Sequence, residues 1–165
     1  MRRNNPGSLG PDQAREIAEE CYGEVMAYCR RHAPAGHDAA DLAQETFLRF
    51  VRTEAYREHG RPIAYLMRTA RSVCVDASRK CRLETVSLDF DVPADERSER
   101  EIELDEALAG LPDDLREAVE LRYGSGLGVG EVARALGISR FAARRRINAA
   151  LKMLEKELEE GGLDG

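Results

Sequence analysis

Three consecutive arginines, Arg144, Arg145 and Arg146, stand close to Asn148 in a segment that otherwise has the apolar spacing of a helix. A guanidinium group can pair with a guanine edge through two hydrogen bonds or clamp a phosphate, and an asparagine amide suits adenine. The whole chain is nevertheless acidic, with a formal net charge of −6. The basic cluster is therefore either a nucleic-acid contact or a solvated face of a helix bundle.

The charges are segregated along the chain. Residues 61–82 carry six basic residues beside a single acid, Asp76, and residues 139–156 carry six more beside only Glu155. The segment between these two blocks is strongly acidic. Two basic blocks joined by an acidic segment favour nucleic-acid binding, which the overall charge alone would argue against.

Residues 131–154 have the layout of a helix-turn-helix. A short helix reaches Gly137, Ser139 is a good N-cap, and a second helix follows. The apolar stripe of this helix should face the core, leaving Arg144, Arg145 and Asn148 on the other side, near the helix start, where a major-groove reader needs them. The stripe consists of Ile147, Ala150, Leu151, Leu154 and Leu158.

The remaining apolar spacing predicts further helices and no credible strand. We expect helices over residues 11–32, from Asp38 or Asp41, from Pro62, over 104–111 and after Pro112. Their expected inward positions, in chain order, are Ile17, Cys21, Val25, Tyr28 and Cys29; Leu42, Phe47, Leu48 and Val51; Ile63, Leu66, Ala70, Val73 and Ala77; and Leu115, Val119, Leu121 and Tyr123.

The predicted fold is all-α, with two small helical domains joined by an acidic and largely unstructured linker. Residues 1–10 form a flexible tail, 11–83 an N-terminal helical bundle, 84–103 the linker, and 104–162 a C-terminal helix-turn-helix bundle. The linker is assigned because it is poor in core residues and rich in like charges.

Several classes of protein are disfavoured. We find no phosphate-binding glycine loop, nucleophile elbow or suitable carboxylate pair, so we expect no enzyme and no cofactor. No apolar run is long enough for membrane insertion and the start lacks a signal peptide, which predicts a cytoplasmic protein with reduced cysteines. A metal or redox sensor built from Cys21, Cys29, His32 and His37 stays open as a weaker alternative, because Cys21 and Cys29 are two helical turns apart.

Three separated segments carry a family resemblance. GLGVGEVARALGISRFAARRRINAALKML resembles the promoter-reading helix-turn-helix of bacterial sigma factors, and DAADLAQETFLRFVR and RPIAYLMRTARSVCVDASRK resemble their polymerase-binding and promoter-melting helices. The order, the spacing and the acidic linker are similar to those of the small extracytoplasmic-function (ECF) class, from about residue 15 to 160. The resemblance implies binding to core RNA polymerase and promoter DNA, initiation at specific promoters, and room for an anti-sigma factor.

The resemblance also implies roles for individual residues. It assigns polymerase binding to Asp38, Asp41, Gln44 and Glu45; minus-ten recognition to Tyr56, Arg68, Arg71, Ser72 and Arg79; and minus-thirty-five recognition to Ser139, Arg140, Arg144, Arg145 and Asn148. Tyr56 would stack on a flipped base, although a surface tyrosine without a role would look the same. The acidic linker would thread the polymerase channels, although a solvated tether would look similar.

Some positions depart from the family pattern. Ser72 stands where Asn is common, Tyr65 where Trp is frequent, and Ala149 where Arg is frequent. Phe141-Ala142-Ala143 replaces a usual Gly-Thr-Val, and Gly128 replaces a capping Ser, with Gly130 following inside that helix. The promoter therefore cannot be copied from the family. A sigma-like adaptor or DNA-binding regulator that does not start transcription remains an alternative.

Overall fold

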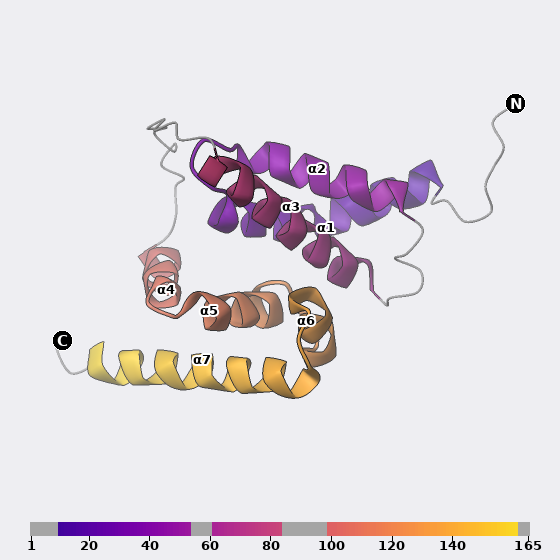
Figure 1. Cartoon of the computed structure of the whole chain (residues 1–165). Coiled ribbons are helices and arrows are strands. Elements are labelled where there is room, and N and C mark those ends of the chain that lie inside the picture. Colours follow the sequence, from indigo (N-terminus) through magenta and orange to yellow (C-terminus); the bar gives the residue numbers. More distant parts are fainter. Residues whose placement is uncertain (1–9, 54–60, 84–98, 162–165) are drawn as a thin grey trace, which may run out of the picture. The chain divides into compact units, whose positions relative to one another are not determined.

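The computed structural model describes residues 10–53, 61–83 and 99–161, which form two compact helical units (Figure 1). These residues form seven α-helices and one π-helical turn, and no strand is found among them, which confirms the predicted all-α class. Tyr56 and most of the predicted linker, residues 84–98, lie outside the described residues. None of the described helices has the length and apolarity needed to span a bilayer.

The first unit consists of α1 (Pro11–His32), α2 (Ala39–Arg52) and α3 (Pro62–Leu83), which pack on one another. Helix α1 has the predicted bounds, with proline at its start, where its missing N–H costs nothing. All five predicted inward residues of α1 are buried. On α3, Leu66, Ala70, Val73 and Ala77 are buried as predicted, while Ile63 is only half-buried.

Of the two predicted starts of α2, Asp38 and Asp41, the structure selects Asp38, whose carboxylate accepts a hydrogen bond from the Ala40 N–H at 2.9 Å and caps the helix. Its predicted inner face is partly wrong. Leu48 and Val51 are 39% and 43% exposed, whereas the buried residues are Leu42, Ala43, Thr46 and Phe50. Phe47 is half-buried.

Burial of Thr46 accounts for the difference between the predicted and the observed inner face of α2. Its hydroxyl donates to the Leu42 carbonyl at 2.8 Å, so the polar group enters the core with its hydrogen bond satisfied. Thr46 and the small Ala43 replace the bulkier Leu48 and Val51 against the neighbouring helices. An apolar count does not anticipate a threonine at the centre of the buried face.

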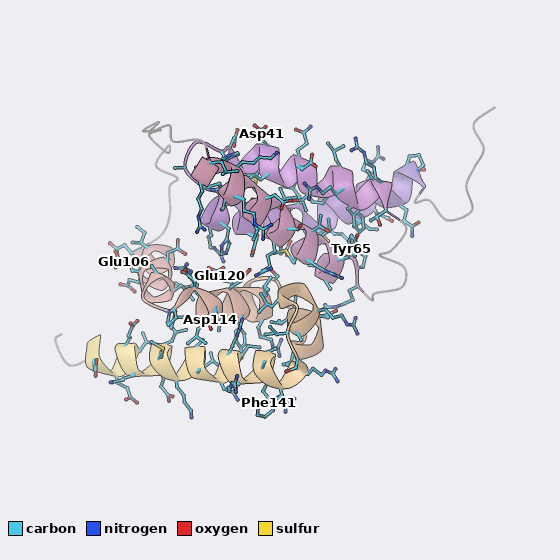
Figure 2. The ribbon with its side chains drawn as sticks, viewed as in Figure 1. Asp41, Tyr65, Glu106, Asp114, Glu120 and Phe141 are labelled. Atoms are coloured by element: carbon cyan, nitrogen blue, oxygen red, sulfur yellow. The ribbon has the colours of Figure 1, made fainter. Side chains whose placement is uncertain are left out.

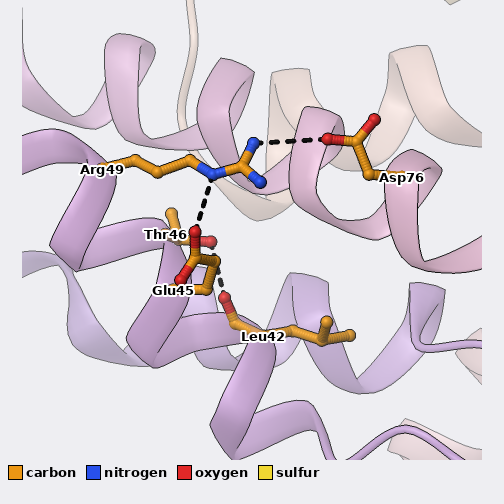
Figure 3. A network of polar contacts seen from close by, with 5 residues as sticks. All are labelled: Leu42, Glu45, Thr46, Arg49 and Asp76. Carbon is orange, nitrogen blue, oxygen red and sulfur yellow. Dashed lines mark hydrogen bonds and ion pairs between the residues drawn. The ribbon is translucent and has the colours of Figure 1, made fainter.

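A polar network ties α2 to α3. Figure 3 shows Arg49 between Glu45, on the same helix, and Asp76 on α3. The Arg49 guanidinium lies 2.9 Å from a Glu45 carboxylate oxygen and 3.3 Å from an Asp76 carboxylate oxygen. The hydrogen bond to Glu45 raises the pKa of the Arg49 guanidinium, with a smaller contribution from Asp76. Asp76, the single acid of the first basic block, is therefore a structural partner of Arg49.

The second unit consists of α4 (Glu99–Ala109), α5 (Asp113–Val119), the π-helical turn η2 (Glu120–Gly124), α6 (Val129–Leu136) and α7 (Arg140–Gly161). Helices α4, α5 and α6 all pack on α7. Helix α4 begins at Glu99, five residues before the predicted start at Leu104. One apolar cluster joins this unit, made of Leu108, Leu111, Val119 and Ala150 with Leu115 and Leu154 packed against it.

Two predicted apolar faces of this unit need correction. Val119 and Leu121 are buried as predicted, but Tyr123 is 59% exposed because the π-helical turn changes the phase of the chain after Val119. Leu127, which was not predicted to face inward, is buried. On α7, Ile147 and Ala150 are buried, but Leu151 and Leu158 are exposed. The buried residues of α7 end at Ala150, with Leu154 half-buried, so the last turns of this 22-residue helix extend beyond the core.

Candidate nucleic-acid interface

The turn between α6 and α7 is fixed by its local chemistry. Gly137 adopts a left-handed conformation with φ of 66°, which glycine reaches without steric cost. Its N–H donates to the Arg134 carbonyl at 3.3 Å and the Ile138 N–H donates to the Ala133 carbonyl at 3.0 Å, a pairing that closes the end of α6. The Ser139 hydroxyl then accepts from the Ala142 N–H at 3.1 Å and caps α7 as predicted.

The start of α6 is better satisfied than its glycines suggest. The Gly128 N–H donates to the Glu131 carboxylate at 2.7 Å, so the side chain at the third position supplies half of a capping box. Gly130 has a separate role. A Cβ built on it would lie 2.9 Å from the Nε and Nη2 atoms of Arg140, so the Arg140 guanidinium lies directly against the first turn of α6.

The three consecutive arginines have three different environments. Arg144 is exposed, while the Arg145 guanidinium lies 5.8 Å from the centre of the Phe141 ring. The Arg146 Nε instead lies 3.7 Å from a carboxylate oxygen of Asp114 on α5. Arg146 therefore connects α7 to the body of its own unit, and the other two arginines stay on the surface.

One exposed face of α7 gathers most of the residues predicted to read DNA. Phe141, Arg145 and Asn148 follow one another at four- and three-residue steps, with Arg144 beside them, and all four are exposed. Ala143, Ile147 and Ala150 are buried on the opposite face. Figure 2 shows Phe141 on the side of α7 that faces away from α5. This face combines guanidinium donors, an amide and one aromatic ring, which are groups that read base edges.

A second basic face lies on α3. Arg68, Ser72 and Arg79 are spaced so that they share one side of the helix, and all three are exposed. Arg71 lies at the margin of this face and is half-buried. The buried positions of α3 lie on the other side, so the described residues predicted for minus-ten recognition are brought together on one surface.

The predicted polymerase-binding residues on and before α2 divide into two groups. Asp38 is the helix cap and Glu45 is the partner of Arg49, so each has a structural role. Asp41 and Gln44 are exposed, and they share a face of α2 with the exposed Leu48 and Val51 (Figure 2 labels Asp41). This α2 face, defined as Asp41, Gln44, Leu48 and Val51, offers both polar and apolar contacts.

Three of the four residues of the sensor alternative belong to the packing of the first unit, whereas His37 is exposed. Cys21 and Cys29 are buried in its core; burial raises the pKa of the Cys21 thiol, and a hydrogen bond with Cys74 lowers that of Cys29. His32 stacks on Tyr28 with 4.2 Å between ring centres. Within the described ranges, no three His, Cys, Asp or Glu side chains are grouped to hold a metal ion.

The fold and these faces define a two-unit helical protein with a helix-turn-helix in its second unit. Residues 17–83 match the family model for sigma-70 region 2, and residues 101–154 match the model for sigma-70 region 4. The chain is 30% identical to the ferric citrate uptake sigma factor FecI of Escherichia coli over 79% of this chain and 82% of that one. It is 33% identical to the ECF RNA polymerase sigma factor SigM of Bacillus subtilis, over 81% and 92%.

Solved structures have the same fold. The sigma factor RpoE of Bartonella quintana, in complex with the anti-sigma factor NepR, superimposes with a TM-score of 0.66 at 20% identity, over 88% of this chain and 96% of that one. CnrH, in complex with the cytosolic domain of CnrY, gives 0.64 at 20% identity, over 92% and 90%. The chain belongs to the sigma-70 family of RNA polymerase sigma factors, in its ECF class. It directs transcription initiation through regions 2 and 4, without enzymatic activity of its own, and binds core RNA polymerase and promoter DNA.

Sequence reasoning missed three exposed apolar residues on these surfaces. Leu48 and Val51 were assigned to the core, although their spacing from Asp41 and Gln44 places all four on one face. Phe141 was noted only as a departure from the family pattern. Its position one turn before Arg145 was the available signal, because residues four apart on a helix are neighbours.

Proposed function

We propose that the exposed face of α7 reads the minus-thirty-five element. Arg144, Arg145 and Asn148 lie opposite the buried side of α7, within its first three turns, and this placement is the observation that carries the proposal. Arg140, held against the start of α6, and the capping Ser139 supply phosphate contacts at the entry to the groove. Arg146 is left out of the reading set because it pairs with Asp114.

The first unit binds polymerase through the α2 face. Its polar residues Asp41 and Gln44 suit a basic helical partner, and the apolar side chains of Leu48 and Val51 supply area that becomes buried on binding. Asp38 and Glu45 act indirectly, because they hold the helix start and the Arg49 network in place.

The basic face of α3 binds the minus-ten region. Arg68 and Arg79 are exposed cations that contact the DNA backbone, with Arg71 at the margin, and Ser72 lies between them as a hydrogen-bonding group. Tyr56 is assigned to stack on a flipped base from its sequence position alone. The acidic segment from residue 84 is assigned to the polymerase channels on its charge.

Regulation by an anti-sigma factor in the cytoplasm completes the proposal. The RpoE and CnrH structures each contain a partner, an anti-sigma factor and the cytosolic domain of CnrY, which makes a comparable partner reasonable for a chain of this fold. Finding this chain co-purified with a stoichiometric inhibitor of its transcription activity would support that partner.

Transcription in vitro with purified core polymerase on a genomic fragment library tests these assignments. We expect initiation from a restricted set of fragments. Asp41→Lys should weaken binding to core enzyme while the helix content stays unchanged, and Glu24→Lys, an exposed acid on α1, is the matched control. Binding to core enzyme without initiation would favour the adaptor hypothesis. Unchanged core affinity of the Asp41 variant would remove the α2 face from the polymerase contact.

A further inference from the structure

Phe141 has an unusual position for a large aromatic residue. It lies in the first turn of α7, it is 74% exposed, and it stands on the same face as the proposed reading residues. Among the described residues of this unit, Leu158 is the only other large apolar residue that is equally exposed. An exposed phenyl ring contributes nothing to the core, so its side chain is available to a ligand that meets the start of α7 (Figure 2).

The ring also has a charged neighbour. The Arg145 guanidinium lies 5.8 Å from the ring centre, within the range of a cation–π contact. This contact restricts where Arg145 points before any DNA is bound. A guanidinium that is already oriented loses less conformational freedom when it pairs with a base.

The surface that meets the first turn of such a helix is the major groove. The apolar group presented there is the C5 methyl of thymine, and phenylalanine is one of the side chains that contact it. We propose that Phe141 contacts the C5 methyl group of one thymine in the minus-thirty-five element and aligns Arg145 on a neighbouring base. The inference rests on the proposed function, since it requires the exposed face of α7 to enter the groove.

The test uses the full chain assembled with core polymerase. A duplex is selected by this holoenzyme from a library randomised across the minus-thirty-five element, and each thymine is then replaced in turn by deoxyuridine, which lacks only the methyl group. We expect wild-type affinity to fall about fourfold at one thymine, the equivalent of one buried methyl group. Phe141→Ala should bind the parent duplex less tightly and should lose sensitivity to deoxyuridine at that position.

Two further variants complete the design. Phe141→Leu keeps an apolar side chain and should keep part of the sensitivity, while Leu151→Ala removes an exposed apolar residue further along α7 and should leave it intact. The inference is overturned if no thymine is sensitive, or if the same position stays fully sensitive in Phe141→Ala. Arg145→Ala distinguishes failure of this inference from failure of the proposed function. If Arg145→Ala loses base preference but the deoxyuridine test fails, the inference about Phe141 is refuted and the proposed function stands. If Arg145→Ala keeps wild-type base preference, the proposed function fails as well.

Discussion

Replacement of Gly130 by alanine should stabilise the helix-turn-helix although it crowds a neighbour. Gly130 is in the first turn of α6, where glycine is less favourable than alanine by about 0.5–1 kcal/mol. The new Cβ would lie 2.9 Å from the Nε and Nη2 atoms of Arg140. Arg140 is exposed and its side chain is flexible, so the guanidinium can move away at little cost.

We expect the helix propensity to outweigh the lost contact, so the net gain is at most about 0.5–1 kcal/mol. Native-state hydrogen exchange measured by mass spectrometry on peptides from α6 and the start of α7 resolves this unit from the other one. A gain of that size slows exchange of these amides by about two- to fivefold. Holoenzyme binding to DNA should weaken uniformly across sequences, because Arg140 is assigned to a phosphate.

Gly137→Ala is the matched control in the same motif. A Cβ on Gly137 meets nothing within 4 Å, but the residue has a φ of 66°, which costs an alanine about 1–2 kcal/mol. Exchange of the same peptides should therefore accelerate by about five- to thirtyfold. Faster exchange in Gly130→Ala would show that the Arg140 contact stabilises the motif by more than the helix propensity gained. Equal protection in both variants would refute the assignment of the turn.

Three other perturbations test the remaining elements. Arg49→Met and Asp76→Asn are combined in a double-mutant cycle measured by urea unfolding. The coupling free energy should be only about 0.2–1 kcal/mol, because the side chains of Glu45, Arg49 and Asp76 are all partly exposed. Zero coupling would show that the Arg49–Asp76 pair does not stabilise the α2–α3 interface. Asp38→Ala should destabilise the first unit by about 1 kcal/mol through loss of the cap, and amides in the first turn of α2 should exchange faster. Asp38→Asn, which keeps a capping side chain, should retain most of the lost stability. Changing the acids of residues 84–98 to amides should tighten binding of the free protein to promoter duplex and steepen the dependence of its affinity on salt concentration. If the variant and the wild-type protein show the same salt dependence, the linker does not mask the basic blocks.

Most of the helices could be predicted from sequence because their ends carry local signals. Pro11 starts α1, Asp38 caps α2, and Ser139 caps α7, and each depends only on neighbouring backbone groups. Burial was harder to predict where it depends on partners. Thr46 replaces Leu48 on the inner face of α2 because its hydroxyl finds the Leu42 carbonyl, and this depends on the helix already being formed.

The sequence predicted which residues of the candidate site lie on the outer face of α7, but not which of its arginines have structural partners. Composition and spacing placed Arg144 and Arg145 on the outer face of α7, where the structure has them. The pairing of Arg146 with Asp114 depends on how α5 packs on α7. The position of the Arg140 guanidinium against α6 depends on the absence of a Cβ on Gly130. Contacts between helices of this kind are not encoded in the spacing of one segment.

The base preference of the holoenzyme across a randomised minus-thirty-five library, compared among arginine variants, tests most directly whether α7 reads the promoter. Arg145→Ala should relax preference at one position by about 1–3 kcal/mol. Arg146→Ala, in the same run of three, should leave preference unchanged because its guanidinium is paired with Asp114. Wild-type preference in Arg145→Ala, or an equal loss in Arg146→Ala, would contradict the assignment of this face.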